Sequence, residues 1–398
     1  MADNGLMSTH PTIHWQEGGV ERSARWRSES GAPPPKRVVL ADDTVAADAA
    51  YRLACEGTAL LWRGDFHNAR QLLQALARRT ERKPRRGEGP AGKVVPSPSE
   101  AFHLHRQAQA QRARVLGMVL MPLDADFTVP LRRAPDFRTA CAEAWGADAA
   151  ADGEASVVSL RELLGLVGAH EWRKKGVEIP ALGGPGHNRI HPHYGVFSPV
   201  RGEYVQLVAQ APLPSKELAF DIGVGTGVLS AVLARRGVKR VVATDQDPRA
   251  LACARENLQR LGLDGQVEVV QANLFPSEAV HGRAPLIVCN PPWVPARANT
   301  PIEHAVYDPD SRMLRGFLDE LAGHLTPGGE GWLILSDLAE HLGLRPREQL
   351  LGWIEAAGLR VLGRMDVRPH HPKAADASDP LHAARAAEVT SLWRLGAP

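Results

Sequence analysis

The segment that most constrains the fold is a glycine-rich stretch at residues 219–230, which reads AFDIGVGTGVLS. It begins as an apolar run that ends in an acid, continues with glycines at positions 223, 225 and 227, and closes on an apolar pattern of helical period. Glycine is needed where the backbone takes a positive φ angle or lets a ligand approach closely. The stretch therefore predicts a strand, a tight turn and a helix, with a ligand at the carboxyl end of the strand.

The spacing of these glycines argues against two common nucleotide-binding motifs. No lysine followed by serine or threonine comes after them, as a phosphate-binding P-loop requires. The third glycine also arrives one residue too early for the dinucleotide pattern G-x-G-x-x-G. An NAD-dependent oxidoreductase is therefore a weak hypothesis for this chain.

Three further segments follow in the order expected of an open α/β sheet. A predicted strand at 238–244 ends at Asp245, about 20 residues beyond the glycines, where such folds place a carboxylate against ribose hydroxyls. The next predicted strand, 266–270, leads to Asn273. The fourth, 286–289, ends in the tetrapeptide Asn290-Pro291-Pro292-Trp293 (NPPW).

Together these segments resemble a class I S-adenosylmethionine (SAM) dependent methyltransferase of the small-methyltransferase type. The NPPW motif is similar to the motif of enzymes that methylate planar amino nitrogens. Two groups of such enzymes come closest. One is the glutamine methyltransferases of release factors and ribosomal proteins, and the other is the ribosomal RNA guanine amino methyltransferases. The resemblance covers residues from about 195 to the C-terminus and implies a Rossmann-like, seven-stranded, mostly parallel sheet with one antiparallel strand. Segments 360–367 and 388–394 are predicted to close it as an antiparallel pair.

The resemblance implies a role for each polar residue at the predicted strand ends. Asp221 would hold the methionine amino group of SAM, and the glycines would let the backbone pass beside its amino acid tail. Asp245 would accept hydrogen bonds from both ribose hydroxyls, a bidentate task that suits a carboxylate. Gln246 and Asn273 would lie at the adenine. The predicted cofactor residues are Asp221, Gly223, Gly225, Gly227, Asp245, Gln246 and Asn273.

The NPPW motif is the predicted catalytic element. An amide or aromatic amine is a poor nucleophile because its lone pair is delocalised. The Asn290 side-chain oxygen and the Pro291 carbonyl can each accept one N–H of the target, which orients the nitrogen and stabilises the charge that develops on it. Pro292 restricts the backbone of Pro291, and Trp293 offers a flat face to a planar substrate. Arg201, which precedes the sheet, is a candidate substrate contact, as is the nearby Glu203.

Composition and length set the wider organisation. The chain has 398 residues, 44% apolar and 23% charged, which favours an ordinary soluble protein of two domains. We expect a disordered or loosely docked arm over 1–40, a mainly helical accessory and substrate-recognition domain over 41–180, and the methyltransferase domain over 181–398. Four cysteines without a CxxC pair, and no signal peptide or long apolar run, favour the cytoplasm. No metal is predicted, since His191 and His193 lack a third ligand nearby.

The sequence leaves the substrate open between two macromolecules. Residues 63–114 hold twelve Lys and Arg against four acids, a net charge of +8 that favours contact with nucleic acid. Asn273 and the stretch GVFS at 195–198 also favour the RNA branch, so an exocyclic base amine of ribosomal RNA is the first prediction. The single N-terminal domain favours the alternative, a glutamine of a release factor or ribosomal protein. An inactive SAM-binding scaffold is a further alternative, which the intact NPPW motif disfavours.

Overall fold

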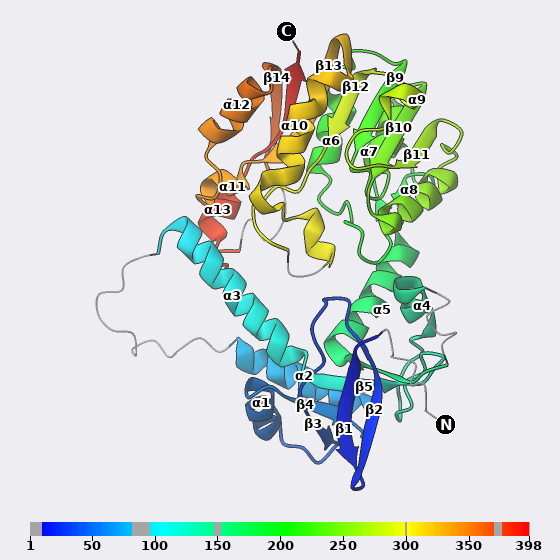
Figure 1. Ribbon diagram of the computed structural model, residues 1–398, viewed down its shortest axis with the longest axis vertical. Coiled ribbons are helices and arrows are strands. Elements are labelled where there is room, and N and C mark those ends of the chain that lie inside the picture. Colours follow the sequence, from blue (N-terminus) through cyan, green and yellow to red (C-terminus); the bar gives the residue numbers. More distant parts are fainter. Residues whose placement is uncertain (1–9, 82–95, 147–152, 299–300, 370–375, 398) are drawn as a thin grey trace, which may run out of the picture. The chain divides into compact units, whose positions relative to one another are not determined.

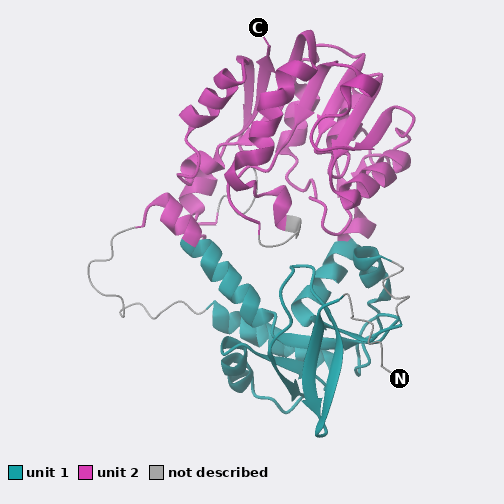
Figure 2. Cartoon of the chain, in the orientation of Figure 1, with its two compact units in different colours: residues 1–95, 104–171 teal, residues 96–103, 172–398 magenta. Residues whose placement is uncertain are grey.

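The computed structural model describes residues 10–81, 96–146, 153–298, 301–369 and 376–397 (Figure 1). The chain divides into two compact units (Figure 2). Unit 1 comprises residues 1–95 and 104–171, and unit 2 comprises residues 96–103 and 172–398. Among the helices of the described residues, none is long and apolar enough to cross a membrane.

Unit 2 is built on a seven-stranded sheet with the strand order β11-β10-β9-β12-β13-β15-β14. The strands β9 to β13 pair in parallel, and β15 pairs antiparallel with both β13 and β14. The predicted mostly parallel sheet with one antiparallel strand is confirmed. Its strands are β9 (Leu218–Ile222), β10 (Arg240–Asp245), β11 (Val267–Gln271), β12 (Ala284–Cys289), β13 (Leu325–Ser336), β14 (Arg360–Val367) and β15 (Thr390–Gly396).

Helices cover both faces of this sheet, as nearly continuous apolar strands require (Figure 1). Alternate residues of β9 serve opposite faces: Ala219 joins one buried cluster, whereas Phe220 and Ile222 join the other. Side chains of α6 (Glu203–Gln210), α7 (Val228–Arg235) and α8 (Pro248–Arg260) fill the first cluster. Those of α10 (Arg312–His324) and α12 (Arg347–Ala356) fill the second.

Shorter elements complete unit 2. They are β7 (Val177–Glu178), β8 (Arg189–Ile190), α9 (Glu278–His281), α11 (Leu338–His341), α13 (His382–Ala387) and the 3₁₀ turns Pro180–Leu182, Pro301–Ala305 and Pro309–Ser311. The start of α3 (Pro98–Leu116) also belongs to unit 2. A capping box opens this helix, because the Glu100 carboxylate accepts from the Ser97 amide at 2.8 Å and the Ser97 hydroxyl accepts from the Glu100 amide at 3.3 Å.

Unit 1 contains a six-stranded mixed sheet with the order β1-β2-β6-β5-β4-β3. Its strands are β1 (Thr12–Glu17), β2 (Val20–Arg27), β3 (Arg37–Ala41), β4 (Thr58–Trp62), β5 (Val119–Leu123) and β6 (Ser156–Ser159). Its helices are α1 (Ala47–Cys55), α2 (Phe66–Thr80), α4 (Arg138–Trp145) and the larger parts of α3 and α5 (Leu160–Lys175).

The prediction of a loose arm over 1–40 was wrong for residues 10–40, which form three strands of unit 1. Gly18 and Gly19 both take positive φ angles, 61° and 78°, and make the tight turn between β1 and β2. Ile13 and Trp26, 1% and 7% exposed, anchor the hairpin in a shared core. An exposed hairpin carries few apolar residues, so it resembles a polar tail in sequence.

The prediction of a mainly helical domain over 41–180 missed a sheet, since four strands of unit 1 fall in or reach into that range. β4 and β5 are short apolar runs, TALLW and VLMPL, that are buried almost throughout. Such runs carry no alternation, so periodicity cannot distinguish them from buried helix. The boundary between the two units lies between residues 171 and 172 rather than near residue 180. In addition, residues 96–103 belong to unit 2.

Candidate active site

The predicted strand ends meet at one edge of the unit 2 sheet. Ile222 of β9 pairs with Thr244 of β10 on one side and with Cys289 of β12 on the other. The residues that follow these three are Gly223, Asp245 and Asn290. The glycine loop, the predicted ribose carboxylate and the NPPW motif therefore begin side by side at the carboxyl ends of neighbouring strands.

The glycine loop requires its glycines for different reasons. Gly223, Gly225 and Gly227 have φ angles of 80°, 51° and 82°, a region that other residues rarely adopt. A Cβ atom on Gly227 would lie 3.3 Å from the Cα atom of Ala254 in α8, so this glycine permits close packing. A Cβ atom on Gly225 would meet nothing within 4 Å. The loop therefore has open space beside Gly225, where a ligand can lie.

Asp245 ends β10 with its carboxylate turned toward this loop. One oxygen accepts from the amide of Gly225 at 3.2 Å, and the other accepts from the amide of Asp247 at 3.0 Å. Burial raises the pKa of Asp245 above its usual value. Each carboxylate oxygen has a second lone pair, so the group retains capacity for two further donors. This arrangement suits a pair of vicinal hydroxyls.

Asp221 lies deeper, within β9, and its residue is only 1% exposed. Its carboxylate accepts from the Ser230 hydroxyl of α7 at 2.6 Å. Burial raises the pKa of Asp221 to about 6, and the nearby charge of Asp245 adds to the shift. A cation bound nearby would favour the charged form of this carboxylate.

The two residues predicted at the adenine are the most exposed of the set. Gln246 follows β10 and Asn273 follows β11, so both lie at the same sheet edge as Asp245. The side chain of Gln271 donates to the carbonyl of Gln246 at 3.3 Å, which links the two loops.

The NPPW motif leaves the sheet at the end of β12 and holds its own side chains together. The indole N–H of Trp293 donates to Oδ1 of Asn290 at 2.9 Å. Pro291 is buried and Pro292 is half-buried. The amide oxygen of Asn290 has a second lone pair, which can accept an N–H from a substrate.

Residues that are distant in sequence hold Trp293 in place. Arg345, only 2% exposed, donates to the Trp293 carbonyl at 3.2 Å. The guanidinium of Arg201 lies over the Trp293 ring, 6.0 Å from its centroid. Arg201 also donates to the carboxylate of Glu388 at 3.1 Å, and the Glu388 residue is 2% exposed. Arg201, predicted as a candidate substrate contact, therefore contacts the NPPW motif through the Trp293 ring.

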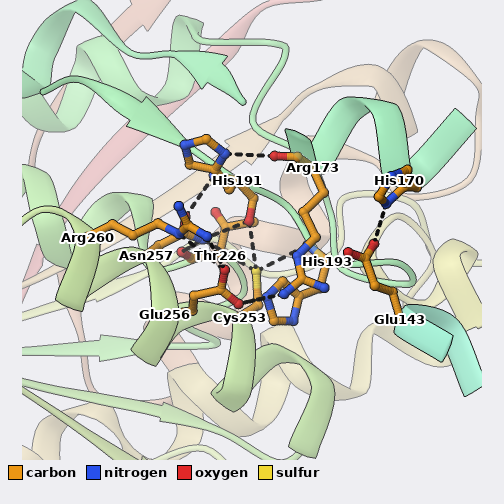
Figure 3. Close-up of polar contacts among 10 residues, drawn as sticks. All are labelled: Glu143, His170, Arg173, His191, His193, Thr226, Cys253, Glu256, Asn257 and Arg260. Carbon is orange, nitrogen blue, oxygen red and sulfur yellow. Dashed lines mark hydrogen bonds and ion pairs between the residues drawn. The ribbon is translucent and has the colours of Figure 1, made fainter. Parts of the chain in front are cut away.

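A second polar cluster connects the glycine loop to the segment that precedes the sheet (Figure 3). Asn257 of α8 is 1% exposed, and its side-chain oxygen accepts from the amide of His191 at 2.7 Å. Its amide group donates to the carbonyls of His191 and Thr226, both at 3.1 Å. His193 contacts Glu256 at 2.7 Å, and Arg173 and Arg260 contact the same carboxylate. Both histidines therefore form hydrogen bonds within this cluster, and the ring of His191 contacts the Arg173 carbonyl.

Several of these residues were not recognised as part of the site from the sequence. They are Asn257, Arg345 and Glu388. All three side chains are buried in the structure, but the sequence does not show this burial. Their partners lie in distant segments, so no local pattern identifies them.

The residues at this sheet edge fit SAM, the cofactor that the resemblance implies. The open space beside Gly225 can take a chain that runs close to the backbone, and the free lone pairs of Asp245 suit ribose hydroxyls. The buried Asp221 suits a nearby ammonium group, because a positive charge would offset its desolvation.

Comparison with known proteins identifies a family for this chain. Residues 187–346 match the family model described as "Methyltransferase small domain". A ribosomal protein L11 methyltransferase of Pelotomaculum thermopropionicum is 40% identical over 146 residues, which are 36% of this chain and 39% of that protein. A release factor glutamine methyltransferase of Cereibacter sphaeroides is 34% identical over 165 residues, 38% of this chain and 54% of the other. The chain therefore spans about two fifths to one half of the length of these two relatives.

A Methanocaldococcus jannaschii protein, provisionally named a protein N5-glutamine methyltransferase, is matched over more of its length. It is 30% identical over 156 residues, which cover 38% of this chain and 76% of that protein. Among solved structures, a ribosomal protein L11 methylase of Lactobacillus delbrueckii subsp. bulgaricus is similar to part of this chain. The match covers 52% of this chain and 83% of that one, with 17% sequence identity and a TM-score of 0.35. The sequence matches show that the chain belongs to the small-domain family of SAM-dependent methyltransferases.

Proposed function

We propose that this protein transfers the methyl group of SAM to the side-chain amide nitrogen of a glutamine in a protein of the translation machinery. The observation that carries the proposal is the register of β9 and β12. Because Ile222 pairs with Cys289, the glycine loop and Asn290 leave the sheet side by side. A methyl donor on the loop and an amide held by Asn290 would then be neighbours.

When bound, SAM supplies an electrophilic methyl group. The protein's task is to present a nitrogen lone pair to it. The free lone pair of Asn290 Oδ1 and the carbonyl of Pro291 accept the two N–H groups of the target amide, which turns the nitrogen lone pair away from the substrate plane. These acceptors also stabilise the positive charge that grows on the nitrogen. The nitrogen then releases one proton to water, so a strong general base is not required.

The relatives support glutamine over an RNA base. Two of the three sequence relatives described above carry glutamine methyltransferase in their names, and the third is named for a ribosomal protein. Part of the basic segment is also engaged within unit 1. Arg63 pairs with Glu17, Arg79 with Asp48 and Arg112 with Glu81. Basic residues 82, 83, 85, 86 and 93 lie outside the described residues. Nucleic-acid binding stays a prediction.

The test is labelled methyl transfer into an extract of cells that lack this protein. Purified protein and SAM labelled in its methyl group are added, and the product is divided between protease and ribonuclease. We expect protease, and not ribonuclease, to release the label. We also expect alkaline hydrolysis to convert the label to volatile methylamine, because hydrolysis of an N-methyl amide frees methylamine. Label released by ribonuclease alone would overturn glutamine in favour of an RNA base. Absence of label, with SAM binding measured separately, would overturn the transfer activity.

A further inference from the structure

We propose that Trp293 is a positioning residue whose indole N–H selects the catalytic orientation of Asn290. The inference rests on the proposed transfer to an amide nitrogen. It assigns Trp293 a task other than stacking on the substrate. The observation that supports the proposal is the 2.9 Å hydrogen bond from Nε1 of Trp293 to Oδ1 of Asn290.

A carboxamide can present either its oxygen or its NH₂ group to a given neighbour. The target nitrogen of the substrate arrives with N–H groups, so Asn290 must present its oxygen to act as an acceptor. The indole N–H is a donor without acceptor capacity. If the Asn290 side chain rotated by half a turn, its NH₂ group would face this donor, and both groups would lose a partner. The indole therefore keeps Oδ1 directed toward the side where a donor arrives.

This selection works only if the indole itself is fixed, and the structure holds it from several sides. Arg345 binds the Trp293 carbonyl at 3.2 Å, and the Arg201 guanidinium lies 6.0 Å from the ring centroid. Arg201 is in turn held by the buried carboxylate of Glu388, whose other oxygen accepts from the Ser336 hydroxyl at 2.7 Å. The indole also contacts residues of three apolar clusters.

The residue type follows from this task. A phenylalanine has a flat face but no donor, and a tyrosine carries its hydroxyl at the far end of the ring. Only tryptophan combines a flat apolar ring with an N–H on its side. Stacking alone would not require this group.

The experiment compares Trp293→Phe with Trp15→Phe as a matched control. In unit 1, the indole of Trp15 likewise donates to a side-chain oxygen, that of Glu17 at 3.0 Å, and likewise lies under an arginine, Arg63 at 5.9 Å. We expect Trp293→Phe to retain SAM affinity within about twofold and to lower kcat about tenfold, the equivalent of ~1.4 kcal/mol for one net hydrogen bond, with little change in KM. Trp15→Phe should leave kcat unchanged. Unchanged kcat in Trp293→Phe, or a rise in KM alone, would overturn the proposal.

A second measurement requires neither enzyme activity nor a correctly folded Trp293→Phe variant. In protein labelled with ¹⁵N at tryptophan, the indole N–H signal of Trp293 is identified by its loss in Trp293→Phe or, if that variant does not fold, in Trp293→Tyr. We expect this signal to move upfield in Asn290→Ala as its acceptor is lost, while that of Trp15 stays in place. A Trp293 signal that stays in place would overturn the hydrogen bond. Absence of transfer by the unaltered protein would instead refute the proposed function and leave this spectral result standing.

Discussion

The side-chain amide of Asn257 donates to the carbonyl oxygen of Thr226 at 3.1 Å, so α8 holds the glycine loop directly. The same side chain bonds both backbone groups of His191. One buried amide thus joins three segments: the glycine loop, α8 and the chain that precedes the sheet (Figure 3).

Replacing Asn257 by leucine should weaken both folding and SAM binding. The variant leaves the carbonyl of Thr226 and the amide of His191 without these partners in a buried place, which we expect to cost about 3 kcal/mol of unfolding free energy. Because the loop loses its support, SAM affinity should fall about tenfold, the equivalent of ~1.4 kcal/mol. Thermal unfolding and calorimetric titration with SAM measure the two effects.

Asn188→Leu is the matched control for that variant. Asn188 is also a buried asparagine of unit 2, and its amide donates to the carbonyl of Gly183 at 3.2 Å rather than to the glycine loop. It should lower the unfolding temperature but leave SAM affinity unchanged. Equal losses of SAM affinity in both variants would show that Asn257 acts only through general stability.

Asn290→Ala should strongly reduce transfer while SAM still binds. Its side-chain oxygen is an acceptor for the target nitrogen, and removing one preorganised partner of a developing charge typically costs about 10²–10³ in kcat. The glycine loop and Asp245 remain intact, so the dissociation constant of SAM should stay within about twofold. Turnover near that of the unaltered protein would contradict the role assigned to the NPPW motif.

Asp221 should make both stability and SAM affinity depend on pH. Its pKa is about 6 in the folded protein against 3.8 for an ordinary aspartate, so the folded state holds a proton that the unfolded state has released between these values. Stability contributed by this group is therefore present below about pH 3.8 and is lost as the pH rises to about 6. At 1.36 kcal/mol per pKa unit, the loss is on the order of 3 kcal/mol.

Asp221→Asn tests this relationship, because asparagine can still accept from Ser230 without carrying charge. At pH 8 the variant should unfold at a higher temperature than the unaltered protein, and the difference should shrink as the pH approaches 4. If Asp221 stabilises the ammonium group of SAM, affinity for SAM in the unaltered protein should decrease as the pH falls through about 6, and the variant should lack this step. A variant with the same pH profile as the unaltered protein would refute the assignment.

The core of unit 2 could be predicted from sequence because each functional motif coincides with a strand end. The glycine loop, Asp245 and the NPPW motif mark the ends of β9, β10 and β12, and parallel strands bring their carboxyl ends to one edge. The antiparallel pair at the C-terminus followed from the resemblance. The sequence alone therefore predicts that these residues lie close together.

The rest depended on contacts that no local pattern encodes. Glu388 reaches Arg201 because β15 inserts between β13 and β14, a topology that leaves no trace in periodicity near either residue. In unit 1, β2 pairs with β6, which lies far away in the sequence, and β4 resembles buried helix. The hairpin of β1 and β2 was mistaken for a tail because its stabilising residues, Ile13 and Trp26, are few.

The pair of Arg201 and Glu388 should behave as a coupled unit. Arg201→Leu leaves the buried Glu388 carboxylate without its arginine, which we expect to cost about 3 kcal/mol of unfolding free energy, and frees one face of the Trp293 ring. Adding Glu388→Gln removes the charge while its side-chain oxygen still accepts from Ser336. The double variant should therefore be more stable than Arg201→Leu alone, with a coupling energy of about 0.5–3 kcal/mol in chemical denaturation. Strictly additive losses would mean that the two side chains do not interact, and Trp293 would then be held by Arg345 and the apolar clusters without this pair.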